Sequence, residues 1–129
     1  MPRDRTHRGK DDQISDRVRF LHMRDAALDA RSYIAGQPRA ALDTNSMLLR
    51  ALVQCLEVIG KAAAKTSDSS RLRAPSVPWP KLVGMRHILV HVYYDIDADT
   101  VWRVVTEDLD RLLEALDAAL ASWPDAAAS

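Results

Sequence analysis

Apolar residues recur every three or four positions over most of the chain, which is the spacing of helices that bury one face. This pattern predicts helices over about residues 15–35, 44–65, 80–94 and 98–122. Gly36 is expected to end the first helix, and Pro124 follows the last. Because the connections are short, the sequence predicts an all-α protein, a four-helix up-and-down bundle.

The first predicted helix has a broad apolar side. Val18, Leu28 and Tyr33 fit a helical stripe, and Phe20 and Met23 widen it. We therefore expect these side chains to face the core.

The second predicted helix contains a glycine in an otherwise strongly helical segment. Asp43 or Thr44 is expected to cap its start. Gly60 costs the helix about 1 kcal/mol relative to alanine, which indicates that another backbone approaches closely there. Trp79, at the entrance of the third helix, is expected to pack in the core.

The remaining segments define one domain with two short ends. Residues 1–13 lack apolar periodicity and are expected to form a flexible basic arm. The four-helix domain is predicted over residues 14–123, with a tail over 124–129. The longest connection, residues 66–80, contains three prolines that interrupt helix.

Composition agrees with a helical protein without a membrane segment. Hydrophobic residues make up 47% of the chain and aromatic residues only 5%. Cys55 is the single cysteine, so no internal disulfide forms, and a buried thiol suits a reducing cytoplasm. No run approaches the roughly 20 apolar residues that span a bilayer. We expect a cytoplasmic protein with no membrane partner.

The charge is zero overall but unevenly distributed. Residues 1–36 carry +2, residues 37–94 carry +5, and residues 95–129 carry −7. Such asymmetry can produce a local positive surface, or it can reflect neighbouring helices that pair their charges.

The third predicted helix contains more polar groups than packing requires. Arg86, His87, His91, Tyr93 and Tyr94 lie within nine residues of an apolar helical pattern. Burying them unpaired would cost several kcal/mol each. They therefore either line a cleft or meet partners.

Arginine and histidine together suit the cleavage of a ribose phosphodiester. A neutral imidazole can take the proton of a 2′-hydroxyl, and a guanidinium can stabilise the charge on the phosphorane. The same pair could also simply bind a phosphate or a carboxylate. No spacing typical of a metal cluster or of a phosphate-binding glycine loop is present, so no metal or cofactor is expected.

Geometry does not gather these groups on one straight helix. Five positions place Arg86 and His91 roughly 140° apart. A kink, the reach of arginine, or a second copy of the helix in a dimer must close this gap. A symmetric dimer would also supply a second histidine as the general acid.

The segment resembles the motif of the HEPN superfamily, and more closely that of the HepT-like toxins, with Arg86, His91 and then Tyr93. The resemblance extends through Leu56-Glu57-Val58-Ile59-Gly60-Lys61-Ala62, Val77-Pro78-Trp79, Gly84-Met85-Arg86 and Asp95-Ile96-Asp97 to Val101-Trp102. It covers about residues 16–116. Two departures stand out: His87 replaces a common asparagine, and Lys61 replaces a common glutamate.

The resemblance implies a dimeric HEPN fold with a metal-independent endoribonuclease site between the protomers. Arg86 and His91 would be its catalytic pair, with His87, Tyr94 and Glu57 as supporting or substrate-binding residues. It implies the toxin of a toxin–antitoxin pair, with tRNA and mRNA as candidate substrates. The implied partner is a minimal nucleotidyltransferase antitoxin that can add AMP to Tyr93.

Purely structural roles for the same residues remain open as alternatives. Arg86 and His91 can be a structural Arg–carboxylate pair and a satisfied core histidine, and Tyr93 can be a tyrosine at the core edge. The alternative function is a non-catalytic subunit of a nucleotidyltransferase that binds nucleotide or RNA without cutting it.

Overall fold

The fold is the predicted bundle of helices. The computed structural model describes residues 2–90 and 95–124, with side chains from residue 16 onward. Its elements are α1 (Pro2–Ile34), α2 (Ala41–Thr44), α3 (Ser46–Lys65), α4 (Asp68–Arg71), α5 (Trp79–Val83), α6 (Met85–Leu89), α7 (Ala98–Arg103), the π-helical turn η2 (Val104–Asp108) and α8 (Leu109–Ala121). The all-α prediction is confirmed.

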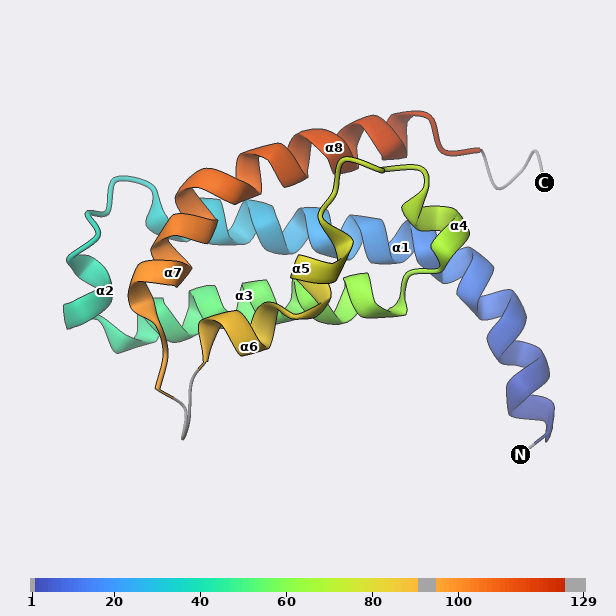
Figure 1. Cartoon of the computed structure of the whole chain (residues 1–129), viewed down its shortest axis with the longest axis horizontal. Helices are drawn as coiled ribbons and strands as arrows, with labels where there is room; N and C mark the ends of the chain where they lie inside the picture. The colour runs from blue at the N-terminus through green and yellow to red at the C-terminus, as the bar shows by residue number, and fades with distance from the viewer. Residues whose placement is uncertain (1, 91–94, 125–129) are drawn as a thin grey trace.

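The long helices stack in layers. Helix α1 packs against α3 on one side and α8 on the other, and α3 also contacts α5 and α6 (Figure 1). The third position of the bundle is therefore filled by two short helices rather than by one long one. None of the described helices is both long enough and apolar enough to cross a membrane.

Helix α1 is longer than predicted and buries a narrower face. It begins at Pro2, well before residue 15, so the backbone of residues 2–13 is helical. That these residues form a flexible arm stays a prediction. Phe20 and Met23 are fully buried, as expected. The expectation for Val18, Leu28 and Tyr33 was wrong: they are 40%, 42% and 44% exposed, because the buried face runs along Phe20, Met23 and the small alanines.

Helix α3 has the predicted extent but a different cap. Neither Asp43 nor Thr44 caps it, since both belong to the short helix α2. Asn45 is the N-cap, and its side-chain oxygen accepts a hydrogen bond from the Leu48 backbone N–H at 3.0 Å. Asparagine is among the residues that best satisfy the free N–H groups at a helix start.

The proline-containing connection is tied to the core by aromatic side chains. Trp79 is buried, as predicted, and its Nε1 donates a hydrogen bond to the Ala74 carbonyl at 3.1 Å. The Phe20 ring lies 5.6 Å from that of Trp79 and 5.0 Å from that of Trp123. These contacts join the start of α5 to α1 and to the end of α8.

The start of the connection is held by a buried carboxylate. Asp16 of α1 accepts hydrogen bonds from Ser67 Oγ and Ser70 Oγ, both at 2.6 Å, and from Arg19 at 3.0 Å. Burial by itself raises the pKa of Asp16, but these hydrogen bonds to the charged form outweigh it and hold the pKa below its ordinary value.

The fourth predicted helix is one continuous element, but it changes from α-helical to π-helical and back. Helix α7 passes through η2 into α8, where the prediction was a regular α-helix. Within η2 the Thr106 hydroxyl donates to the Trp102 carbonyl at 2.7 Å. Such π-turns are rare insertions that frequently lie at functional sites.

Candidate functional site

Of the residues predicted as the site, Arg86 and His87 lie on a short helix that follows a break. Helix α5 ends at Val83, with Gly84 as its C-cap, and α6 then runs only from Met85 to Leu89. Leu82, Met85 and Leu89 are buried in the core. Because Met85 faces the core, the position after it, Arg86, faces away from the core, and its side chain is exposed.

This break packs directly on α3. A Cβ added to Gly60 would lie 2.9 Å from the Leu82 carbonyl oxygen and 3.4 Å from Met85 Cβ. The predicted close approach of another backbone at Gly60 is therefore confirmed. It positions Met85, the residue before Arg86, against the C-terminal half of α3.

Among the described residues, the side chains of Arg86 and His87 have no hydrogen-bond or ion-pair partner, and both are exposed. Glu57 is half-buried on α3 and forms no ion pair with Arg86. The described structure thus gives no support to a structural Arg–carboxylate pair at Arg86. His91, Tyr93 and Tyr94 lie outside the described residues.

The two ends of the segment that contains His91 are paired with each other. Val90 and Ile96 form an isolated antiparallel bridge, and the Asp97 N–H donates to the Leu89 carbonyl at 2.8 Å. Asp97 then caps α7, accepting hydrogen bonds from the Thr100 N–H at 3.1 Å and hydroxyl at 2.8 Å. The chain therefore leaves α6 and enters α7 at neighbouring points.

This arrangement corrects one step of the sequence argument. The expectation of a helix through residues 80–94 was wrong, because helix is interrupted at Gly84 and ends at Leu89. Val90 is extended, with φ of −122° and ψ of 120°. Helical rotation therefore does not relate His91 to Arg86, and the 140° separation is no argument for a dimer. The dimer itself stays a prediction.

Pairing between helices explains part of the uneven charge. Acidic side chains of the last 35 residues meet arginines of α1 and the connection after it: Arg24 bonds Asp117 at 2.6 Å, and Arg31 contacts Asp110. Arg39 lies 2.7 Å from Asp99. Asp108 of η2 lies 3.5 Å from Lys81 of α5 and 3.7 Å from Arg103 of α7.

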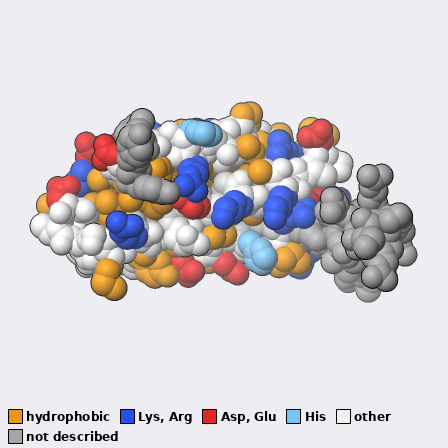
Figure 2. All heavy atoms as spheres, turned by 90° about the horizontal axis from the view of Figure 1, so that it is seen from below, with side chains coloured by type: hydrophobic (Ala, Val, Ile, Leu, Met, Phe, Trp, Pro, Cys, Tyr) orange, Lys and Arg blue, Asp and Glu red, His pale blue; other side chains and the backbone are white. Residues whose placement is uncertain are grey.

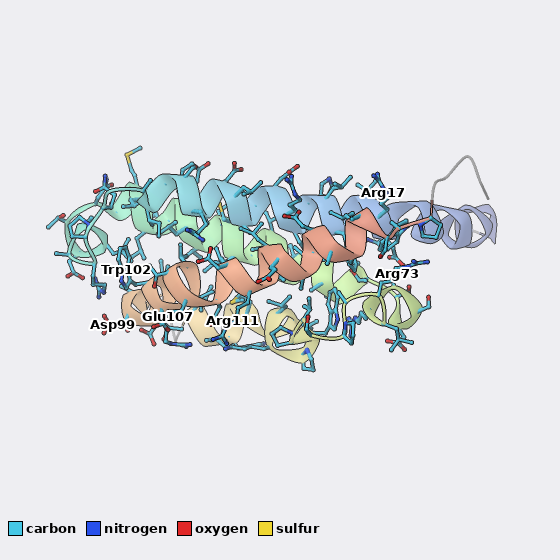
Figure 3. All side chains as sticks on the ribbon, turned by 90° about the horizontal axis from the view of Figure 1, so that it is seen from above. Arg17, Arg73, Asp99, Trp102, Glu107 and Arg111 are labelled. Atoms are coloured by element: carbon cyan, nitrogen blue, oxygen red, sulfur yellow. The ribbon has the colours of Figure 1, made fainter. Side chains whose placement is uncertain are left out.

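Figure 3 labels Asp99, Glu107 and Arg111 on the α7–α8 side of the bundle. The opposite face, which α3 and α6 form, carries a row of lysine and arginine side chains (Figure 2). Both sequence interpretations of the charge therefore hold in part: the acids are paired between helices, and a basic surface remains beside Arg86.

Two cavities have linings that do not include Arg86 or His87. One of about 600 Å³ opens between α5 and α8, with Met85, Leu82 and Leu112 in its lining and Lys81, Asp108 and Arg111 among its charged residues. Another of about 370 Å³ lies between α1 and α3 beside Cys55. Burial and the charge of Asp29 raise the pKa of the Cys55 thiol. The described residues contain no group of three or more ligands placed to hold a metal ion.

Comparison with known proteins agrees with the motif. The sequence profile of the HepT-like ribonucleases matches residues 23–119. The chain belongs to the HepT-like ribonuclease family.

Curated relatives carry related names. A candidate RNase of Methanocaldococcus jannaschii is 36% identical over 73 residues, which are 57% of this chain and 67% of that protein. A second candidate RNase of the same organism is 37% identical over 68 residues, 53% of this chain and 56% of that protein. A candidate ribonuclease HepT of Thermococcus cleftensis is 32% identical over 62 residues, 48% of this chain and 56% of that protein. No solved structure matches the chain.

Sequence reasoning did not single out two features of this site. The role of Asp97 in pairing with Leu89 depends on a contact that periodicity does not reveal. The exposed lysines Lys61 and Lys65 of α3 could have been found from the sequence, because they are four positions apart and lie opposite the apolar side of the helix.

Proposed function

We propose that this chain is a metal-independent endoribonuclease that cleaves RNA at the 2′-hydroxyl, with Arg86 and His91 as its catalytic pair. The observation that carries the proposal is the placement of Arg86. Its guanidinium is exposed at the family motif, with no carboxylate partner among the described residues, and is thus available to a phosphate.

The chemistry needs a base and a charge stabiliser. A neutral His91 imidazole would remove the proton of the 2′-hydroxyl, because its ordinary pKa of about 6.5 is close to working pH. Arg86 would hold the developing charge on the phosphorane with two directed hydrogen bonds. The reaction forms the bond from the 2′-oxygen to phosphorus and releases the 5′-oxygen, which takes a proton from a general acid.

The reaction also needs a general acid, and a second protomer would supply it. In a symmetric dimer the partner's copy of the motif histidine would protonate the leaving oxygen. His87, Tyr94 and Glu57 are proposed as supporting residues, with His87 exposed next to Arg86.

The biological role proposed is that of a toxin whose antitoxin is a minimal nucleotidyltransferase. Addition of AMP to Tyr93 would place bulk and negative charge two residues from the catalytic histidine. The negative charge of AMP would repel the RNA backbone, and its phosphate would compete with RNA for Arg86. Both effects would block cleavage.

Two assays test the nuclease. Expression of the wild-type chain should arrest growth, and the purified protein should cleave RNA in the presence of a metal chelator. Arg86→Ala and His91→Ala should abolish both effects. Arg111→Ala is the matched control, because it removes an exposed arginine from α8, on the other side of the bundle.

The outcomes separate the alternatives. Equal toxicity of wild type and both motif variants, or no cleavage by the purified dimer, would reject the nuclease and leave a non-catalytic nucleotidyltransferase partner. For the modification, the intact mass is measured after incubation with ATP and the cognate transferase. A gain of one AMP that disappears in Tyr93→Phe is expected, and a gain that survives this change excludes Tyr93.

A further inference from the structure

Helix α3 presents a polar stripe to solvent beside the motif. Arg50, Gln54, Glu57, Lys61 and Lys65 follow each other three or four positions apart and so share one face of the helix. Four of these side chains are exposed and Glu57 is half-buried. We call Arg50, Lys61 and Lys65 the basic stripe.

The basic stripe differs from the other basic groups in how its charge is used. Arg24, Arg31 and Arg39 form ion pairs with aspartates of the acidic part of the chain. Within the described part of the chain, no carboxylate lies within ion-pair distance of any residue of the basic stripe. The neutral total charge therefore hides a face with uncompensated positive charge, which Figure 2 shows as the row of lysine and arginine side chains.

The stripe is continuous with the candidate site. Gly60, which precedes Lys61, is the point where α3 touches the α5–α6 break, and Met85 at that contact precedes Arg86. Lys61 and Arg86 thus lie on either side of one backbone contact. From Arg50 to Lys65 the helix rises about 22 Å, enough to follow several successive phosphates of a strand.

We propose that the basic stripe binds the phosphate backbone of single-stranded RNA and leads it to Arg86. This rests on the proposed nuclease function and adds residues outside its motif. Contacts of this kind position a strand without reading its sequence, because phosphates are the same at every nucleotide. Glu57, in the middle of the stripe, divides the contacts into one at Arg50 and two at Lys61 and Lys65.

The experiment measures binding without cleavage. The full chain carrying His91→Ala is titrated against a fluorescently labelled single-stranded RNA of mixed sequence at several salt concentrations. Each phosphate contact contributes about −0.7 to the slope of log K against log salt for a single strand. Changing Arg50, Lys61 and Lys65 to glutamine together should make the slope shallower by about 2 and weaken binding most at low salt.

Matched variants keep the result interpretable. Arg111→Gln removes one positive charge from the α8 side and should leave the slope unchanged. Lys61→Arg and Lys65→Arg keep the charge and should bind like the parent. Circular dichroism of every variant verifies that α3 is intact, which glutamine permits because it is a good helix former.

Each outcome decides something. Failure of the parent to bind RNA rejects the nuclease function and this proposal with it. RNA binding by the parent with an unchanged slope in the triple variant overturns the basic stripe alone. Unchanged RNA binding together with weaker binding of the nucleotidyltransferase would likewise overturn it and assign the face to that protein.

Discussion

Gly60→Ala tests whether the contact between α3 and the α5–α6 break positions the site. The new methyl carbon would stand 2.9 Å from the Leu82 carbonyl oxygen, closer than such atoms approach in proteins, and 3.4 Å from Met85 Cβ. The oxygen belongs to the backbone, so it cannot swing aside as a side chain would. The α5–α6 break must move away from α3, and Arg86 must move with it.

The expected magnitude follows from two opposing effects. Forcing extra volume into a packed contact costs about 1–3 kcal/mol. Replacing glycine with alanine inside a helix returns about 1 kcal/mol. We therefore expect the free energy of unfolding to fall by about 1 kcal/mol. RNA cleavage is expected to fall further than stability explains, because small displacements of a catalytic group reduce rates strongly.

Urea unfolding followed by circular dichroism measures the first effect, and initial cleavage rates measure the second. Ala64→Gly, at an exposed position of α3, gives the cost of a glycine in this helix without any packing change. If Gly60→Ala gains as much stability as Ala64→Gly loses, and cleavage is unchanged, the contact is not tight and the reasoning is refuted.

Three further predictions concern other parts of the fold. Asp97→Ala should lower the free energy of unfolding by about 1 kcal/mol and reduce RNA cleavage, because it removes the cap of α7, whereas Asp97→Asn should keep the stability; equal losses in urea unfolding would argue against the cap. Because the pKa of Asp16 is lower in the folded chain than in the unfolded one, its contribution to stability is present above about pH 4 and is lost as the pH falls through the folded value. Unfolding measured against pH should therefore be flatter below pH ~4 in Asp16→Asn than in wild type, and identical curves would contradict this. Cys55 should react slowly with iodoacetamide in the native protein and quickly in urea, because burial and Asp29 raise the pKa of its thiol; rapid native labelling, measured by mass, would oppose this.

Much of the fold follows from features that are local in the sequence. The long helices were predicted because each has apolar residues at helical spacing over many turns. Gly36, with a φ of 74°, ends the region of α1 as expected, because only a residue without Cβ adopts that conformation easily. The close approach at Gly60 was also predictable, since a glycine there is unfavourable unless space requires it.

The errors occur where a contact distant in sequence decides the local structure. Apolar spacing from Leu82 to Val92 continued across Gly84, so one helix was predicted. In the structure the helix ends at Leu89, where the extended Val90 pairs with Ile96. Similarly, Val18 and Tyr33 fit an apolar stripe, but the axis along which α3 and α8 meet α1 leaves them exposed.

The family was predictable from the residues of the motif, whereas the geometry around Arg86 was predictable only in part. The combination of Arg86 with its neighbours gave the family, which the profile over residues 23–119 confirms. That Arg86 is exposed depends on the break at Gly84, and that the α3 face stays positive depends on ion pairs made by the other helices. Periodicity does not contain either fact.

The bridge between Val90 and Ile96 lets the length of the segment between them change with little effect on the stability of the bundle. Since the two flanks bond to each other, the fold already fixes both ends of the segment that lies between them in the sequence. Doubling the length of a flexible segment between two fixed ends costs only about 0.6 kcal/mol in chain entropy. Insertions or deletions there would change the reach of His91, the histidine proposed as catalytic, while leaving the core contacts of the described helices in place. A protein built in this way can acquire a new substrate by altering a few residues, without refolding its scaffold.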